Sequence, residues 1–323
     1  MDINLAVIGV GGHALRNTLP ALQAMDKVNI AGILTRNKEI AKETSQSYRC
    51  ESFTSLEQVL ENEQVNCVYI ALPTGLHAEY GLKVVDAGKH LWCEKSLTHD
   101  LDSCTQLIAR AQQNKVAVCE CFMYQFHPQF ERLKQLINES RIGKPVNILA
   151  RFCFPHRDPG DVRYSAELGG GALLDAGCYL LHSCRLLLEE VPTRVVSSLA
   201  TEVGFEVDTS GYAVLEFKAG TNAWLNWGYG MAYVNELEIL GESGRIRVER
   251  AFSKPAGYQS LIEIQDASGS KEVLEIPPAN HFVKMFTEFT RACEDDALKT
   301  TYFNDAMAQS RLLNELRTGG QPG

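Results

Sequence analysis

Apolar and polar residues alternate along the first 121 positions in a pattern of short strands and helices. Residues 3–8 are almost all apolar, which predicts a buried strand that ends at Gly9. Leucines then recur at helical spacing between Leu15 and Leu22. The same analysis predicts further strands at 28–34, 65–72, 90–93 and 116–119 and helices at 38–47, 56–61, 78–87 and 100–114. Strands that alternate with helices predict a parallel sheet covered on both faces.

The second half of the chain has a different pattern. Strands separated by short turns are predicted at 147–154, 195–203, 210–217, 223–229, 235–240, 244–248 and 261–265. Helices are predicted at 172–188, 281–293 and 305–316, and the glycine-rich end, 319–323, is predicted to be disordered. Short links between consecutive strands favour an antiparallel sheet. The chain therefore divides into a first domain at 1–121 and an α+β domain with a large, mostly antiparallel sheet at 122–323.

The turn after the first strand carries a nucleotide-binding pattern. Residues 9–14 read Gly-Val-Gly-Gly-His-Ala, which matches G-x-G-x-x-A. In such a turn the first glycine reverses the chain, and the second lets backbone amides approach a pyrophosphate at the helix N-terminus. The alternative is a plain tight turn. Because a strand precedes the pattern and a helix follows it, we expect an α/β Rossmann domain whose Gly9, Gly11, Gly12 and His13 bind a dinucleotide.

The end of the second strand indicates which dinucleotide. Thr35, Arg36 and Asn37 stand where an enzyme for the unphosphorylated cofactor places an acidic residue. The guanidinium of Arg36 can pair with a phosphate through two hydrogen bonds, and its neighbours can donate beside it. A solvated loop arginine is the alternative. NADP is therefore expected in preference to NAD.

Composition narrows the class of protein. The 323 residues are 45% hydrophobic and 22% charged, with a net charge of −9, which is typical of a soluble globular protein and argues against nucleic acid or membrane as a partner. Ten cysteines are present without a C-x-x-C pair, so no metal site is expected. We interpret these cysteines as reduced and the protein as cytoplasmic, without a signal peptide or a membrane span.

Two further polar segments follow predicted strands. Pro73, Thr74 and His77 come after the strand at 65–72, and Glu94 and Lys95 after the strand at 90–93. Open parallel sheets bind ligands at these strand ends. An ammonium group there can stabilise negative charge on a reacting oxygen, so Lys95 is the first catalytic candidate. A solvated lysine, and a histidine that caps or packs, are the alternatives.

Five segments in this order resemble the glucose-fructose oxidoreductase / inositol dehydrogenase family and span most of the chain. They are Gly9-Val10-Gly11-Gly12-His13, Pro73-Thr74-Gly75-Leu76-His77, Glu94-Lys95-Ser96, Phe122-Met123-Tyr124-Gln125-Phe126-His127-Pro128 and Leu168-Gly169-Gly170-Gly171-Ala172-Leu173-Leu174-Asp175-Ala176-Gly177-Cys178-Tyr179. The resemblance implies that four groups of residues contact the cofactor: the glycine turn with His13, the segment Thr35 to Asn37, the residues Pro73, Thr74 and His77, and the pair Glu94 and Lys95. It also implies that the second sheet serves oligomerisation, in a homodimer or homotetramer. Two positions depart from the family: Ser96 replaces its proline, and Tyr179 replaces the histidine acid/base of its dehydrogenase branch.

The helix after the glycine triplet carries the remaining catalytic candidates. Asp175, Tyr179 and His182 are spaced i, i+4 and i+7, which places them along one face, although such a stripe is also typical of a solvated surface. By the resemblance this helix faces the nicotinamide, and Tyr179 exchanges the proton. A phenol requires a cationic neighbour for that task, which Lys95 can supply. Asp175 then orients Lys95 or a substrate hydroxyl, and His182 contacts the substrate as the alternative acid/base.

The loop at 152–164 indicates the substrate. It resembles the corresponding segment of nucleotide-sugar 3-ketoreductases, which implies that His156, Arg157 and Arg163 receive a diphosphate and that Tyr164 stacks on a sugar or base. Ordinary loop arginines are the alternative. We therefore expect an NADP(H)-dependent oxidoreductase that reduces the keto group of a nucleotide-linked keto-sugar. Two other classes of protein remain possible. One is a dehydrogenase of a free sugar or trans-dihydrodiol. The other is a non-catalytic nucleotide sensor, because Ser96 replaces the family's proline next to Lys95.

Overall fold

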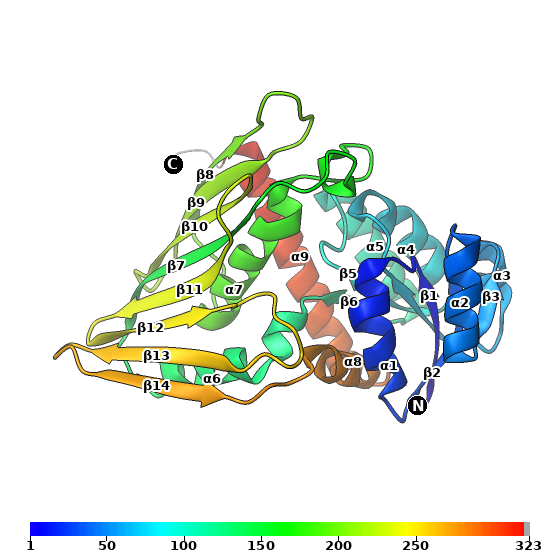
Figure 1. Ribbon diagram of the computed structural model, residues 1–323, viewed down its shortest axis with the longest axis horizontal. Coiled ribbons are helices and arrows are strands. Elements are labelled where there is room, and N and C mark those ends of the chain that lie inside the picture. Colours follow the sequence, from blue (N-terminus) through cyan, green and yellow to red (C-terminus); the bar gives the residue numbers. More distant parts are fainter. Residues whose placement is uncertain (320–323) are drawn as a thin grey trace. The chain divides into compact units, whose positions relative to one another are not determined.

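The computed structural model describes residues 1–319, so the predicted disorder of 320–323 lies outside the described residues. The chain forms two compact units (Figure 1). The first contains Met1–Phe122 and Phe282–Ser310, and the second contains Met123–His281 and the residues from Arg311 onward. The sequence placed every residue after 121 in the second domain, whereas residues 282–310 pack with the first unit.

The first unit is built on a parallel sheet, as predicted. Its strands are β1 (Ile3–Ile8), β2 (Val28–Leu34), β3 (Glu51–Phe53), β4 (Cys67–Ile70), β5 (His90–Glu94) and β6 (Val118–Cys121). The spatial order is β3-β2-β1-β4-β5-β6, and every neighbouring pair is parallel. The strand order therefore reverses between β1 and β4. β3 was not predicted, because its three residues contain only one buried apolar side chain.

Helices connect and cover these strands. They are α1 (Leu19–Gln23), α2 (Lys38–Tyr48), α3 (Leu56–Glu61), α4 (His77–Asp86), α5 (Leu101–Asn114), α8 (His281–Ala292) and the part of α9 (Asp296–Thr318) up to Ser310. A π-helical turn, Ala14–Thr18, precedes α1, and a 3-10 turn, Thr74–Leu76, precedes α4. The last helix begins nine residues before its predicted start at 305.

Side chains leave the parallel sheet alternately toward two buried layers. Ile70 belongs to a core that includes Leu107 of α5. On the other face, the ring of Trp92 stacks on Phe286 of α8 at 5.3 Å, and Tyr69 meets the same ring edge-on at 5.6 Å. A helix from the end of the chain thus completes the first unit, which local sequence patterns do not indicate.

The second unit is built on an eight-stranded sheet. Its strands are β7 (Pro145–Phe154), β8 (Arg194–Ala200), β9 (Ser210–Glu216), β10 (Asn222–Tyr229), β11 (Val234–Gly241), β12 (Gly244–Glu249), β13 (Ser260–Asp266) and β14 (Lys271–Ile276). The order is β14-β13-β12-β11-β7-β10-β9-β8, with β7 and β10 parallel and all other pairs antiparallel. The prediction of a large, mostly antiparallel sheet is confirmed. β14 escaped prediction because its side chains are mostly exposed.

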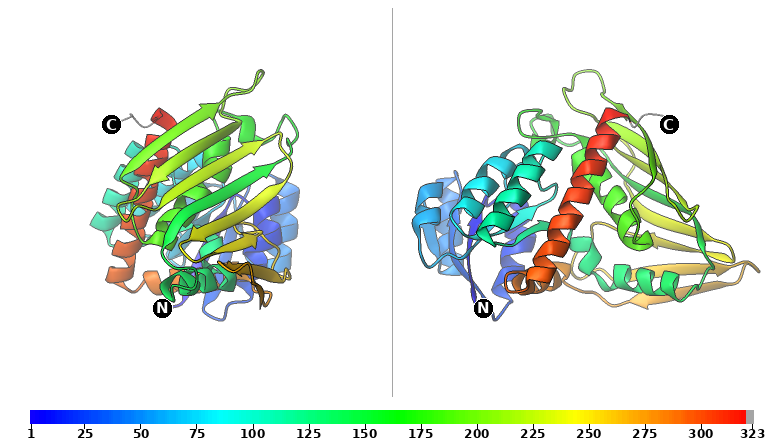
Figure 2. Two further views of the ribbon diagram at one scale, coloured as in Figure 1. Left: turned by 90° about the vertical axis from the view of Figure 1, so that its left-hand side faces the viewer. Right: turned by 180° about the vertical axis from the view of Figure 1, so that it is seen from behind.

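Helices α6 (Pro128–Asn138) and α7 (Cys178–Leu188) lie on one face of this sheet, and the other face is open to the viewer in the left panel of Figure 2. The strand β10 shows the resulting alternation. Leu225 and Trp227 are buried under α7, whereas Trp224 is 55% exposed. The strand predicted to be apolar on both sides therefore has one covered face and one open face.

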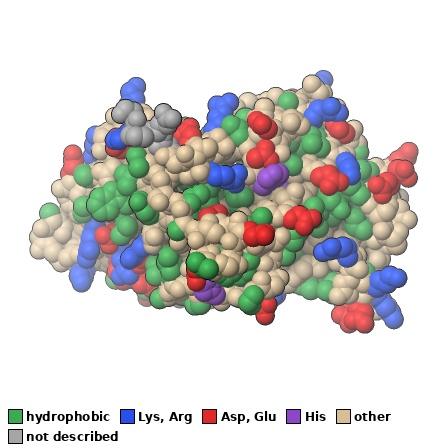
Figure 3. Space-filling model, turned by 90° about the horizontal axis from the view of Figure 1, so that it is seen from above, with side chains coloured by type: hydrophobic (Ala, Val, Ile, Leu, Met, Phe, Trp, Pro, Cys, Tyr) green, Lys and Arg blue, Asp and Glu red, His purple; other side chains and the backbone are tan. Residues whose placement is uncertain are grey.

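All ten cysteines are free thiols, and nine of them are buried. Within residues 1–319, none of the helices combines the length and apolar character that crossing a membrane requires. In the same part of the chain, no three side chains of His, Cys, Asp or Glu are arranged to hold a metal ion. Acidic and basic side chains are interspersed on the face shown in Figure 3.

Candidate active site

Three strand ends of the first unit meet at the glycine turn. Gly9 has a φ of +91°, and its N–H donates to the Leu34 carbonyl at the end of β2 over 2.9 Å. A Cβ at Gly9 would lie 2.8 Å from the carbonyl carbon of Ala71, directly after β4. Only glycine satisfies this conformation and this packing. The turn therefore lies at the point where the strand order reverses, which is where sheets of this type bind nucleotides.

The rest of the turn differs between its two remaining glycines. A Cβ at Gly11 would meet no atom within 4 Å, so the packing of the chain itself does not require glycine there. A Cβ at Gly12 would lie 2.8 Å from Nη1 of Arg16. The guanidinium of Arg16 thus lies over the turn. The sequence prediction missed this residue, although its position four residues after Gly12 on a helical segment is a usable signal.

The three candidate residues after β2, Thr35, Arg36 and Asn37, differ in their contacts and exposure. The Asn37 side chain accepts hydrogen bonds from the N–H groups of Glu39 and Ile40, at 3.0 and 3.1 Å, and caps α2. Its oxygen therefore serves the helix rather than a ligand. Arg36 is exposed and Thr35 half-buried. Arg36 is therefore the positively charged residue of the predicted Thr35–Arg36–Asn37 segment, and its side chain is exposed.

A half-buried carboxylate lies next to the turn. Glu94, at the end of β5, accepts a hydrogen bond from the Tyr69 hydroxyl, and Nε2 of His13 lies 3.2 Å from its Oε1. Burial acts to raise the pKa of Glu94, but His13, Tyr69 and Lys95 outweigh it and hold the pKa below its ordinary value. Burial acts to lower the pKa of His13, and Glu94 reverses this, so the pKa of His13 is raised. The pair favours an imidazolium beside the glycine turn.

His77 lies between two loops rather than at a ligand surface. Its Nδ1 lies 2.8 Å from the Ser96 carbonyl and its Nε2 2.7 Å from the Leu72 carbonyl, and the residue is buried. Burial lowers the pKa of His77, against the effect of both carbonyls and of Glu94. This differs from the predicted cofactor contact, because the two carbonyls already occupy both ring nitrogens. The positive charge of Lys95 also acts to lower the pKa of His77. The Lys95–Ser96 peptide bond is cis.

In the second unit, Asp208 holds the start of the helical segment that carries the catalytic candidates. The N–H of Leu173 donates to Asp208 Oδ2 at 2.7 Å, and the N–H of Ala172 donates to the Asp208 carbonyl at 2.8 Å. Gly171, before them, has a φ of +116°. A π-helical turn, Leu173–Gly177, then leads into α7. The sequence prediction did not find Asp208, which lies far away along the chain.

Tyr179 lies among aromatic side chains. Its hydroxyl donates to Sδ of Met123 at 3.5 Å, and its ring lies 5.8 Å from Tyr124 and 6.0 Å from Phe252. His182, one turn further along α7, is completely buried, with Nδ1 2.7 Å from the Tyr124 hydroxyl. The predicted contact of His182 with substrate is not compatible with this burial. The side chain instead holds Tyr124 against the helix.

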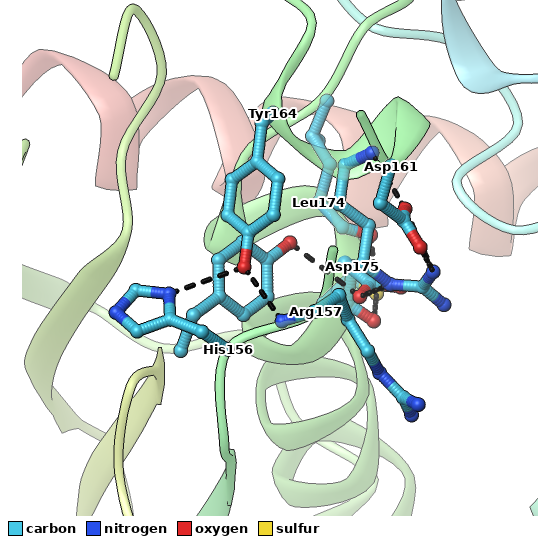
Figure 4. Close-up of polar contacts among 9 residues, drawn as sticks. His156, Arg157, Asp161, Tyr164, Leu174 and Asp175 are labelled. Atoms are coloured by element: carbon cyan, nitrogen blue, oxygen red, sulfur yellow. Dashed lines mark hydrogen bonds and ion pairs between the residues drawn. The ribbon is translucent and has the colours of Figure 1, made fainter. Parts of the chain in front are cut away.

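Figure 4 shows that Asp175 is an ion-pair partner within its own unit. Nε of Arg163 donates to Asp175 Oδ2 at 2.7 Å, and Nη1 of Arg163 lies 3.1 and 3.2 Å from the two carboxylate oxygens of Asp161. The Tyr229 hydroxyl lies 3.4 Å from Asp175 Oδ2. Arg163, predicted to receive a diphosphate, is therefore engaged by two carboxylates.

The neighbouring loop residues are ordered by Tyr164. The Tyr164 hydroxyl accepts the N–H of Arg157 at 3.0 Å and lies 3.1 Å from Nδ1 of His156. Nε2 of His156 lies 3.1 Å from Glu202, and its ring stacks on Phe205 at 5.6 Å. Tyr164 is thus buried in the loop instead of presenting a free face for stacking. Arg157 keeps an exposed guanidinium, 5.6 Å from the Phe154 ring.

Comparisons with known proteins identify the family. A model described as "Oxidoreductase family, NAD-binding Rossmann fold" matches residues 3–122, and the "GFO/IDH/MocA C-terminal domain" matches residues 130–247. A dTDP-3,4-didehydro-2,6-dideoxy-alpha-D-glucose 3-reductase from Actinomadura kijaniata is 32% identical over 99% of this chain and 96% of its own. The chain belongs to the Gfo/Idh/MocA family of oxidoreductases.

Two further proteins are similar to nearly the whole of this chain. A D-xylose 1-dehydrogenase (NADP(+)) from Haloferax volcanii is 27% identical over 98% of this chain and 97% of its own. The solved structure of a 3-ketoreductase from Actinomadura kijaniata with NADP and TDP-benzene has a TM-score of 0.94 and 33% identity, covering 99% of this chain and 98% of that one. The family resemblance predicted from the five motifs is confirmed.

Proposed function

We propose that this protein is an NADPH-dependent reductase of a keto group on a nucleotide-linked keto-sugar. The observation that carries the proposal is the whole-length likeness to a dTDP-keto-sugar 3-reductase. The exposed guanidinium of Arg157, on the loop that follows β7, supports it.

The residues of the first unit fit a phosphorylated dinucleotide. The open face of Gly11 leaves room for a pyrophosphate to approach the backbone, and Arg16 places a cation over the same turn. Arg36 stands exposed at the end of β2, where a 2′-phosphate is read in folds of this kind. When bound, NADPH supplies the hydride.

The chain's own residues supply charge and proton. The ammonium of Lys95 stabilises the negative charge that develops on the carbonyl oxygen. The hydroxyl of Tyr179 donates the proton that completes the alcohol. Asp175, an acceptor at neutral pH, orients a hydroxyl of the sugar, and Arg157 binds the diphosphate. These roles of the four residues are proposals.

The test is a steady-state assay with purified protein, NADPH and a dTDP-linked 3-keto-2,6-dideoxy-sugar, followed by nicotinamide absorbance. We expect turnover of this compound and at least about tenfold lower kcat/KM for the same sugar without its nucleotide, because the contacts with Arg157 are then lost. Equal turnover of both compounds would contradict a nucleotide-linked substrate.

Oxidation of a free sugar is the second candidate, and the likeness to the Haloferax xylose dehydrogenase favours it. D-xylose or a trans-dihydrodiol with NADP tests it in the same assay. NADPH binding without turnover of any of these compounds would instead support a nucleotide-responsive sensor.

We further propose that the protein is a cytoplasmic homo-oligomer whose copies join through the open face of the eight-stranded sheet. Trp224, Val214 and Val196 are register partners across β10, β9 and β8, and Trp224 and Val196 are 55% and 37% exposed. Such a row of apolar side chains is typical of an interface. Trp224→Glu should yield monomers in light scattering, whereas the control Val203→Glu, at a residue that is 99% exposed, should not.

A further inference from the structure

We propose that Arg163 is a positioning residue that holds Asp175 ready to accept a substrate hydroxyl, and that it is not a ligand of the diphosphate. The inference rests on the proposed function, because it uses the role proposed for Asp175. By this inference, the side chain of Arg163 binds Asp175 on the helical segment after the glycine triplet and does not bind the nucleotide.

The geometry of the guanidinium is the first argument. One edge meets Asp175 through Nε at 2.7 Å, and Nη1 meets both oxygens of Asp161 at 3.1 and 3.2 Å (Figure 4). The planar fork of arginine makes such paired contacts directional. The Tyr229 hydroxyl adds a contact to the same Asp175 oxygen at 3.4 Å, so the carboxylate is held from the loop and from β10.

The backbone of Arg163 is built into the start of the same helical segment. Its carbonyl accepts the N–H of Gly171 at 2.9 Å, and its own N–H donates to Asp161 Oδ1 at 3.0 Å. A Cβ at Gly170 would lie 2.4 Å from the Arg163 carbonyl oxygen. The glycines therefore let the chain pass close to Arg163, and side chain and backbone together fix the loop to the segment that bears Asp175.

The two arginines of the loop, Arg157 and Arg163, differ in the charges that surround them. Arg163 faces two carboxylates, and Asp175 beside it raises the pKa of Arg163 above its ordinary value. A diphosphate brought to Arg163 would meet the negative charges of Asp161 and Asp175 as well. Arg157 contacts the Phe154 ring with its guanidinium and is exposed, so it is the better phosphate ligand.

The ion pair also affects the protonation of Asp175. A cation at hydrogen-bonding distance favours the carboxylate over the acid, which keeps Asp175 an acceptor. The other titratable groups of this unit that contact the pair are Asp161 on the loop and Tyr229 on β10. The negative charge of Asp161 acts against a second carboxylate beside it, and the guanidinium of Arg163, which contacts both carboxylates, offsets that repulsion.

The test compares Arg163→Gln, Arg163→Lys and the control Arg157→Gln in the keto-sugar assay over a range of pH. We expect Arg163→Gln to lower kcat about tenfold, to change KM for the nucleotide-linked sugar less than about twofold, and to move the acid limb of kcat/KM to higher pH. Arg163→Lys should restore the acid limb but only part of kcat, since lysine keeps the charge without the fork. Arg157→Gln should raise KM alone.

Two results would overturn the inference. A raised KM for Arg163→Gln with kcat and acid limb unchanged would make Arg163 a diphosphate ligand after all. A lower kcat without movement of the acid limb would reduce Arg163 to a structural role. Failure of the proposed function is seen separately, as a wild type without turnover or as Asp175→Asn with wild-type kcat.

A measurement that needs no turnover completes the test. In denaturant unfolding, Arg163→Gln with Asp175→Asn should lose less stability than the sum of the two single variants, because the second change no longer breaks an ion pair. Strictly additive losses would mean that the two side chains are not coupled, and the inference would fail even for an inactive protein.

Discussion

Removing the guanidinium of Arg36 tests the cofactor assignment most directly. Arg36 follows β2, whose last residue, Leu34, accepts the Gly9 N–H at 2.9 Å, so this segment of the backbone lies beside the glycine turn. It is exposed, and the helix cap is made by Asn37 instead. Arg36→Ala therefore removes a charge without disturbing an internal contact of the described residues.

The size of the effect follows from the contacts that the guanidinium can make. Two charge-assisted hydrogen bonds to a 2′-phosphate, weakened by solvent at this exposed position, contribute about 2–3 kcal/mol in total. This corresponds to NADPH binding that is about 30- to 150-fold weaker. NADH carries no such phosphate, so its affinity should change by less than about threefold.

Fluorescence titration of both cofactors, at two salt concentrations, measures these affinities. The control is Lys42→Ala, which removes an exposed positive charge from α2 away from the turn. The NADPH difference should shrink at high salt, because the contact is ionic and exposed. An equal loss of affinity for NADPH and NADH, or a loss as large for Lys42→Ala, would refute the assignment of Arg36 to the phosphate.

Three further predictions address catalysis, packing and pH. Tyr179→Phe should lower kcat about a hundredfold, the low end of the range for the loss of a general acid, while the affinity for NADPH stays unchanged; wild-type kcat would remove the phenol from the mechanism. Gly177→Ala should cost about 1–3 kcal/mol in urea unfolding, because its Cβ would lie 2.9 Å from the Trp227 ring; full stability would contradict this packing. Burial and Lys299 lower the pKa of His90 from 6.5 to about 4. The contribution of the neutral His90 to the free energy of unfolding is therefore fully present above pH 6.5. It is lost as the pH falls toward 4, and the loss is about 3 kcal/mol at most. His90→Asn should flatten the stability profile in this window, and an unchanged slope would exclude His90 as its source.

Strands, helices and turn chemistry are largely readable from the sequence, because they depend on neighbours a few residues apart. The buried run before Gly9 and the helical spacing after it define β1 and the turn without other information. By contrast, the sequence of β10 did not predict which face of the strand is exposed, because Trp224 on the exposed face and Trp227 on the buried face are equally apolar.

The hydrogen-bond and ion-pair partners of polar side chains could not be predicted from the sequence in this way. The sequence marked Arg163, His77 and His182 as ligand-binding, yet each meets a group of the protein itself. These partners come from other loops and strands, so sequence spacing does not place them. A charged or aromatic side chain near a strand end looks the same whether it faces a ligand or a carbonyl.

The sequence by itself determined most of the secondary structure, the glycine turn and the family, because periodicity, glycine geometry and motif order are local properties of the chain. Only the tertiary structure decided that α8 covers the parallel sheet and that Asp175 is paired with Arg163. Both outcomes depend on which distant segments are brought into contact, and burial then obliges each polar group to find its partner there.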